Sequence, residues 1–211
     1  MHPWFRNASK DFFQHVWLRG GFIWRLPANE RTLALTFDDG PDPVHTPATL
    51  DLLARLKVKA TFFLIGRNAE QYPDLVRRIV QEGHAIGGHT FEHVVITQQS
   101  ESQLADDLQR CRVLMRQLSG VDSTLFRPPK GEVNVAAIRR VCRLGYQLVH
   151  WSKTYSDYQQ DGADALCARI ERDPAQPGDI VLFHDNNPHT VEALARAIPA
   201  WQSAGFSFRV L

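Results

Sequence analysis

The chain is short of cysteine, of net charge and of long apolar runs, and each shortage excludes a class of protein. Its three cysteines form no Cys-x-x-Cys pair and leave an odd count, which argues against a disulfide framework and a thiolate zinc site. A formal charge of +1, with no block of like charges, argues against nucleic-acid binding. No run reaches the roughly 18 apolar residues of a membrane-spanning helix. With 211 residues, 44% of them hydrophobic, the chain suffices for one globular domain with a full core.

The first 30 residues differ in composition from the remainder. They contain Trp4, Trp17 and Trp24, three of the five tryptophans, and residues 1–31 carry five basic and two acidic side chains. We predict a helical N-terminal segment over residues 1–30 that closes one end of the domain. The alternative is an interfacial helix that makes peripheral contact with a membrane through aromatic and basic side chains. Because the N-terminus lacks the apolar core and cleavage site of a secretory signal, we expect a cytoplasmic protein, at the inner membrane surface under the second alternative.

Short apolar runs alternate with amphipathic stretches along the rest of the chain. Strict alternation of this kind implies parallel βαβ units. A complete eight-fold barrel takes about 250 residues, so we predict an α/β fold with a distorted or incomplete (β/α) barrel of about seven parallel strands. An open doubly wound sheet is the alternative. Six stretches with helical spacing separate the predicted strands, which cover residues 32–37, 60–65, 85–86, 125–126, 146–151, 180–183 and 206–210.

Uncommon polar residues follow five of the predicted strands. In parallel α/β folds, reactive groups collect just past the carboxyl ends of the strands. A set of ordinary turn residues would not align with the strand ends in this way, so the pattern favours an active site at one end of the barrel. The residues that follow the strands are Asp38, Asp39, His89, His93, Arg127, Asp157 and His184.

One pair of histidines has a spacing that suits a metal ion. His89 and His93 lie four residues apart, so both imidazoles can reach one cation, from adjacent helical turns or from a strand-to-helix loop. A carboxylate from Asp38 or Asp39 at the same end would complete a site with open positions for water and substrate, as a catalytic divalent metal requires. We expect zinc, with cobalt, nickel or manganese as alternatives.

Five short motifs, taken together, resemble a known family: the polysaccharide deacetylases with a NodB-like domain, also called carbohydrate esterase family four. The resemblance spans residues 31–211, which it identifies as a NodB homology domain, and the family's distorted seven-stranded (β/α) barrel agrees with the strand count. The motifs occur in the family's order: Thr-Phe-Asp-Asp-Gly at 36–40, His-Thr-x-x-His at 89–93, Arg-Pro-Pro-x-Gly at 127–131, a Trp-led loop ending in Asp-Tyr at 151–158, and Leu-Phe-His at 182–184.

The resemblance implies an activity and a role for each motif residue. The activity is metal-dependent hydrolysis that removes an N-linked acetyl group from an N-acetylated amino sugar. Asp38 is implied to be the general base and His184 the general acid, while Arg127 orients Asp38, and Asp157 orients His184 and raises its pKa. The metal ligands would be Asp39, His89 and His93, the oxyanion would take a backbone N–H of Lys130, and the sugar would contact Trp151 and Tyr158.

Three positions depart from the family's usual residues. Lys130 stands where an aromatic residue is common, Thr154 where an acidic residue is usual, and Tyr158 where Trp is frequent. No metal ligand or acid–base residue is lost, so we expect turnover on an acetylated amino-sugar glycan or a lipid-linked sugar. The alternatives are an O-deacetylase or N-deformylase of a lipid-linked sugar and, more distantly, a carbohydrate-binding pseudoenzyme.

The interfacial alternative for residues 1–30 predicts membrane binding. The full chain should co-sediment with vesicles that contain anionic lipid, because basic side chains are attracted to that surface, and less with vesicles of neutral lipid. Equal recovery in the supernatant with both kinds of vesicle would contradict the alternative.

Overall fold

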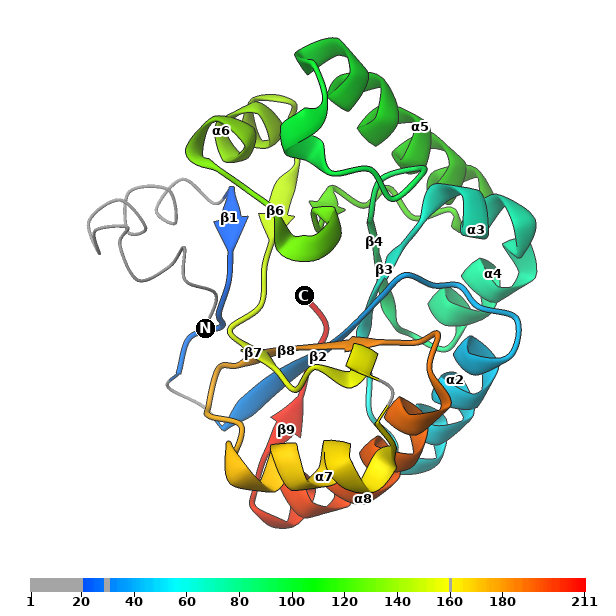
Figure 1. Cartoon of the computed structure of the whole chain (residues 1–211). Helices are drawn as coiled ribbons and strands as arrows, with labels where there is room; N and C mark the ends of the chain where they lie inside the picture. Colours follow the sequence, from blue (N-terminus) through cyan, green and yellow to red (C-terminus); the bar gives the residue numbers. More distant parts are fainter. Residues whose placement is uncertain (1–20, 29–30, 160) are drawn as a thin grey trace.

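The computed structural model describes residues 21–28, 31–159 and 161–211. Their strands form one nine-stranded sheet in which every strand pair is parallel, and the helices lie around its outside (Figure 1). The strands are β1 (Phe22–Ile23), β2 (Thr32–Asp38), β3 (Thr61–Leu64), β4 (Ala85–Gly88), β5 (Leu125–Phe126), β6 (Gln147–Val149), β7 (Lys153–Thr154), β8 (Ile180–His184) and β9 (Ser207–Phe208).

The α-helices lie in most, though not all, of the connections between successive strands of the sheet. Three short 3-10 segments, η2 (Ile96–Gln98), η3 (Pro129–Gly131) and η4 (Asp157–Gln159), lie in loops. In the described part of the chain, no helix combines the length and the apolar character needed to cross a membrane. The α-helices are α2 (His45–Leu56), α3 (Gly66–Gln71), α4 (Pro73–Gln81), α5 (Glu101–Ser119), α6 (Val135–Arg143), α7 (Ala163–Arg172) and α8 (Pro188–Ser203).

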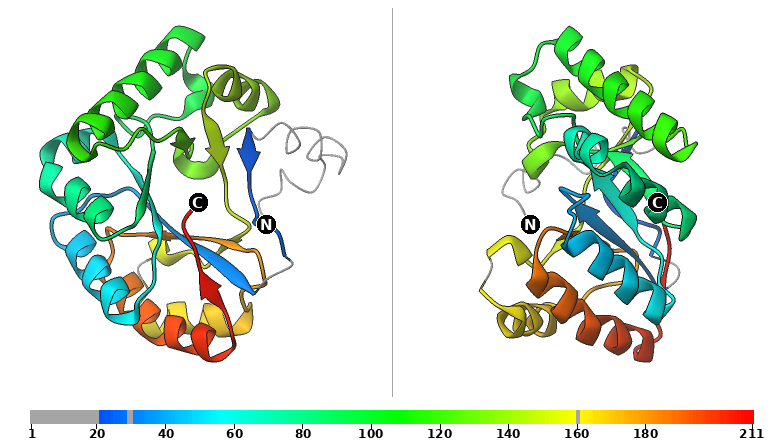
Figure 2. Two further views of the ribbon diagram at one scale, coloured as in Figure 1. Left: turned by 180° about the vertical axis from the view of Figure 1, so that it is seen from behind. Right: turned by 90° about the vertical axis from the view of Figure 1, so that its right-hand side faces the viewer.

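The sheet is an incomplete barrel. Its strands follow the order β1-β6-β5-β4-β3-β2-β8-β7, and β9 pairs with β2 beside this path. After β1, the chain reaches the start of β8 through an antiparallel bridge between Arg25 and Asp179 and a hydrogen bond from Leu26 N–H to Gly178 O at 2.8 Å. Figure 2 shows the curved sheet and its outer helices from two further sides. The predicted distorted barrel is confirmed, and the doubly wound alternative is wrong because the helices cover the outside of the sheet only.

All seven predicted strands are present, and β1 and β7 are additional. Each of these two strands has only two paired residues, which is too short for a recognisable apolar pattern. The alternation is also less strict than predicted, since β6 continues to β7 without a helix, and α3 precedes α4 between β3 and β4.

The helical prediction for residues 1–30 is wrong in its described part. Residues 21–28 contain β1 and no helix. Phe22 is buried in the core and pairs with Leu148 of β6, so this stretch completes the sheet instead of forming a separate segment. Residues 1–20 and 29–30, which carry the remainder of that prediction, lie outside the described residues.

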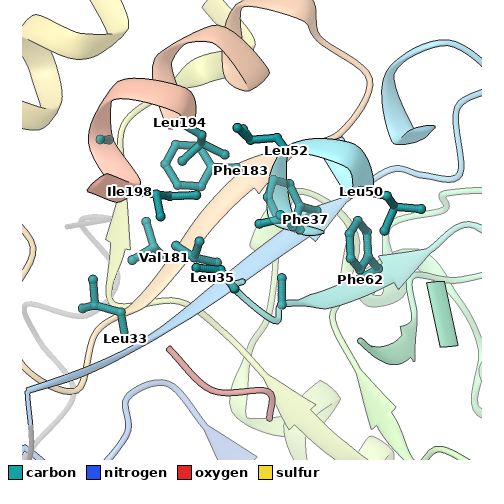
Figure 3. Close-up of a cluster of buried hydrophobic side chains, with 14 of the residues drawn as sticks. Leu33, Leu35, Phe37, Leu50, Leu52, Phe62, Val181, Phe183, Leu194 and Ile198 are labelled. Atoms are coloured by element: carbon teal, nitrogen blue, oxygen red, sulfur yellow. The ribbon is translucent and has the colours of Figure 1, made fainter. Parts of the chain in front are cut away.

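Two central strands fix the position of the barrel end. All seven residues of β2 are buried, as are the first four of β8, because each strand has neighbours on both sides and apolar contacts on its faces. Figure 3 shows their side chains packed with those of β3, α2 and α8. Phe37 stacks on Phe62 with 5.1 Å between ring centroids. The register aligns Asp38 with His184, so these two polar residues leave the core side by side.

Candidate active site

The two adjacent aspartates at the end of β2 face different partners. Asp38 is the last residue of the strand, and its Oδ1 accepts a hydrogen bond from Arg127 Nη1 at 2.8 Å. Asp39 leaves the strand with φ at +74°, a left-handed backbone that is uncommon for a residue with a side chain. Its Oδ1 lies 3.2 Å from His93 Nε2 and 3.5 Å from His89 Nε2. The backbone turn at Asp39 therefore points its carboxylate towards the two histidines, while the carboxylate of Asp38 is bonded to Arg127.

Asp39, His89 and His93 form a candidate cation site. One ligand atom from each lies within 4.8 Å of the others. His89 is buried, and its Nδ1–H donates to the carbonyl of Arg127 at 2.8 Å, which leaves the lone pair on Nε2, the ring nitrogen near Asp39, available for a metal. Burial lowers the pKa of His89, so its imidazole is neutral, as a metal ligand must be.

The carboxylate of Asp39 fits a bound cation. Burial opposes its charged form, but the close contact with His93 and the positive charge of His184 lower its pKa to about 2. Its Oδ1 is buried and accepts no hydrogen bond of normal geometry within the described residues. A buried anionic oxygen without a donor is unfavourable unless a positive charge compensates it. Two imidazole nitrogens and one carboxylate are a donor set that suits zinc and other divalent transition metals.

The histidine pair comes from a loop after β4. Thr90 and His93 both have positive φ values, of 60° and 58°, so the chain folds back on itself between the two ligands. The two imidazole rings lie 5.1 Å apart. Of the two arrangements that the spacing allowed, the loop is therefore the one adopted.

Arg127 carries a positive charge that is buried completely. Its Nη1 donates to Asp38 Oδ1 and, at 2.7 Å, to Thr36 Oγ1, while its Nη2 donates to the carbonyl of His150 at 3.3 Å. The guanidinium also lies over the ring of Phe63, 4.1 Å from its centroid. Since its own carbonyl accepts a hydrogen bond from His89, Arg127 contacts both a carboxylate of the pair and a candidate ligand, and its bond to Asp38 is the contact that the expected orienting role requires.

His184 and Asp157 form a second polar pair beside the aspartates. His184 Nδ1–H donates to Asp157 Oδ1 at 2.9 Å, and Asp157 Oδ2 accepts from the His184 backbone N–H and the Thr190 hydroxyl, each at 2.8 Å. Burial disfavours the imidazolium, but the hydrogen bond and charge of Asp157, together with Asp38 and Asp39, raise the pKa of His184 to about 9. The predicted tether and the direction of the pKa change are both present, and His184 is protonated at neutral pH.

The remaining predicted residues lie around this centre. Lys130 is exposed, with φ at +58°, in the turn η3. Trp151 stacks on His150 with 4.0 Å between ring centroids, and it packs over Gly131, where an added Cβ would come within 2.3 Å of the indole. Tyr158 is 62% exposed and stands edge-on to His184, 6.2 Å between centroids. The third and fourth motifs thus meet through Gly131 and Trp151.

A cavity of about 280 Å³ opens beside the candidate cation site. It gives the ligands Asp39 and His93 an accessible side, where water and a substrate could enter. The cavity is lined by Asp39, Asp42, Ile65, Arg67, Asn68, His93 and Asn186.

Sequence reasoning missed a buried carboxylate, Asp185. It accepts a hydrogen bond from Thr46 Oγ1 at 2.5 Å, and burial raises its pKa to about 7. A Cβ added at Gly40 would come 2.5 Å from both of its oxygens, so Gly40 is needed for space beside Asp185. The available signal was the position of Asp185 directly after His184, at the end of an apolar run.

The chain is similar to several deacetylases. A family profile described as polysaccharide deacetylase matches residues 25–149. The chain is 38% identical over 194 residues to a peptidoglycan-N-acetylglucosamine deacetylase of Bacillus cereus, covering 90% of each chain. It is 32% identical over 202 residues to a chitooligosaccharide deacetylase of Azorhizobium caulinodans, covering 89% of this chain and 96% of the relative.

A solved structure supports the same similarity in three dimensions. A peptidoglycan N-acetylglucosamine deacetylase in complex with 4-naphthalen-1-yl-N-oxidanyl-benzamide superposes with a TM-score of 0.88 at 33% identity, covering 94% of each chain. The profile match contains both aspartates, the histidine pair and Arg127. The candidate cation site therefore lies within the part of the chain that matches the family.

Close contact between Gly40 and Asp185 predicts a specific coupling. Gly40→Ala should destabilise the protein by about 1–3 kcal/mol, because its Cβ overlaps the Asp185 carboxylate. Adding Asp185→Ala should recover part of that loss, so that the two changes are not additive. Urea unfolding of the wild type, both single variants and the double variant measures the coupling. Gly88→Ala, whose Cβ would meet its nearest atoms at 3.8 Å, is the matched control. Strictly additive losses would contradict the contact.

Proposed function

Since the chain belongs to the polysaccharide deacetylase family, we propose that it removes the N-linked acetyl group from an N-acetylated amino sugar in a glycan or glycan precursor, using a divalent metal ion. As a member of this family it is a hydrolase of carbon–nitrogen bonds other than peptide bonds. One observation carries the proposal: a candidate cation site and two differently held acid–base groups meet at one end of the barrel.

Each side chain of the site suits one step of amide hydrolysis. A divalent cation held by Asp39, His89 and His93 would polarise the acetyl carbonyl and acidify the attacking water. Asp38, oriented by its bond to Arg127, would accept the proton of that water. The backbone N–H of Lys130 would help to stabilise the oxyanion of the tetrahedral intermediate, as the resemblance to the family implies.

Departure of the amine requires a proton, because an unprotonated amide nitrogen is a poor leaving group. His184 can supply it, since Asp157 holds the imidazole through Nδ1 and keeps it protonated with a pKa of about 9. The strand register brings His184 next to Asp38. A proton donor and a proton acceptor are therefore available on neighbouring strands at neutral pH.

The metal is proposed to be zinc. The donor set of two imidazoles and one carboxylate leaves positions for water and substrate, the usual arrangement in catalytic zinc sites. Cobalt, nickel and manganese accept the same donor types and are the alternatives.

The substrate is proposed to be an acetylated amino-sugar glycan or a lipid-linked sugar. The similar proteins are named for peptidoglycan N-acetylglucosamine and for chitooligosaccharides, which supports an acetylated amino-sugar polymer. The cytoplasmic location stays a prediction, and with it the preference for a soluble or lipid-linked precursor. O-deacetylation and N-deformylation would use the same residues. The pseudoenzyme alternative is disfavoured because all the acid–base and ligand side chains are present.

Metal removal and mass spectrometry test the activity. Chelation should abolish loss of one acetyl group from acetylated sugar oligomers or lipid-linked sugars, and added zinc or cobalt should restore it. Asp39→Ala should abolish activity because it removes one of the three candidate metal ligands. Asp38→Asn should lower kcat by about 100- to 10,000-fold because it removes the proposed general base. Asp74→Asn, at a carboxylate 93% exposed on α4, is the control. Full activity of Asp39→Ala would contradict the assignment of Asp39 as a metal ligand. Release of formate instead of acetate would favour the deformylase alternative.

Exchange of Asp157 for Asn should change the pH dependence. His184 acts as an acid only when protonated, so wild-type kcat/KM should fall as the pH rises through the pKa of His184. Burial lowers the pKa of His184, and the negative charge of Asp157 offsets this effect. Asp157→Asn removes that charge, so the pKa of His184 should fall from about 9 towards or below its ordinary value of 6.5. The alkaline limb of the pH–rate profile should then move to lower pH. NMR titration of His184 in metal-free protein measures the same change directly.

A carboxylate nearby in the sequence provides the control for this prediction. Asp161 is paired with Arg169 at the surface, so Asp161→Asn should leave the pH profile unchanged. An unchanged profile and His184 titration in Asp157→Asn would contradict the role of Asp157.

A further inference from the structure

The short helix α3, which the sequence pattern did not reveal, touches both segments that carry candidate ligands. In its first turn, the backbone N–H groups of Gly66 and Arg67 donate to the carbonyls of Thr90 and Phe91, each at 3.0 Å. Thr90 and Phe91 lie between the two candidate ligands His89 and His93 in the sequence. An added Cβ at Gly66 would come within 2.4 Å of the Phe91 side chain, so the helix and the histidine loop are in close contact.

The same helix also holds the aspartate. Asn68 Nδ2 donates to the backbone carbonyl of Asp39 at 2.8 Å. Just before the helix, Ile65 N–H donates to the carbonyl of Gly40 at 2.9 Å. Asp39 is the residue with φ at +74°, a conformation that a non-glycine residue adopts at an energetic cost. A donor fixed on a helix can hold the peptide that follows this strained residue and so fix the direction of its carboxylate.

We propose that Asn68 is a positioning residue for the cation site: its side-chain amide maintains the left-handed backbone of Asp39, so that the carboxylate meets His89 and His93. The inference rests on the cation site of the proposed function, and it adds a residue outside the five motifs. Asn68 would act before any substrate binds, through the free energy needed to bring the three ligands together.

Two other roles for Asn68 lead to different results. Asn68 also lines the 280 Å³ cavity, and a direct contact with the sugar would change KM without changing metal affinity. A role in folding alone would lower the thermal stability of the metal-free protein without a separate effect on metal binding. Metal affinity in the absence of substrate separates positioning from both.

The experiment uses the full chain, freed of metal, and zinc as the probe. Asn68→Ala removes the amide, and Asn68→Leu keeps a similar volume without a donor. Zinc affinity is measured by competition with a chromophoric chelator, and the absorption spectrum of bound cobalt reports ligand geometry. Both variants should bind zinc about 10- to 100-fold more weakly, the usual effect of losing a group that orients a ligand. Thermal unfolding of the metal-free variants should stay close to wild type.

A matched control comes from the same helix. Gln71 is exposed at the end of α3, so Gln71→Ala should bind zinc as the wild type does. Wild-type zinc affinity in both Asn68 variants, with an unchanged cobalt spectrum, overturns the inference and leaves the proposed function intact. Failure of the wild type itself to bind zinc or cobalt refutes the cation site and, with it, the inference. Weaker binding that only parallels a loss of metal-free stability in both variants also overturns it.

Discussion

The arrangement of the site depends on one fully buried positive charge. Arg127 has no access to solvent, so its guanidinium must be compensated by groups within the barrel. Asp38 supplies the negative charge, Thr36 and the carbonyl of His150 accept its other hydrogen bonds, and the Phe63 ring covers its face. With its guanidinium bound to the end of β2, Arg127 presents its own carbonyl to His89. A single residue therefore links the proposed base to the proposed metal site, and the two cannot move independently.

The division between the two aspartates follows from their backbones. Asp38 is still in the strand and shares its register with His184, whereas Asp39 has already turned into a left-handed conformation. Strand alternation alone would send neighbouring side chains to opposite faces. The left-handed turn adds a change of direction after the strand, and close packing around Gly40 and Asp185 surrounds it. The two adjacent acids thereby obtain different electrostatic surroundings. Asp38 is paired with the guanidinium of Arg127 and lies 3.9 Å from His89 Nε2, whereas Asp39 is closer to the imidazoles of both His89 and His93.

Much of the fold could be predicted from the sequence because the central strands are rich in apolar residues. The runs that became β2 and β8 end in Asp38 and His184, and these two residues proved to lie together. The two-residue strands β1 and β7 could not be found, since their pairing depends on neighbours distant in the sequence. The residues of the five motifs were located from the sequence, but the residues outside the motifs that pack against them or bond to them were not. Asp185 and Thr46 meet across 139 positions, and such a contact leaves no local pattern.

The aligned register of Asp38 and His184 has a consequence for how such a site can arise or be transferred. Parallel strands that slip by one residue exchange the faces to which their side chains point. In this barrel, that slip would separate the two groups while leaving every motif intact in the sequence. The proposed acid–base pair therefore depends on the pairing of β2 with β8, and grafting the loops alone onto another scaffold would transfer the two residues without their relative position.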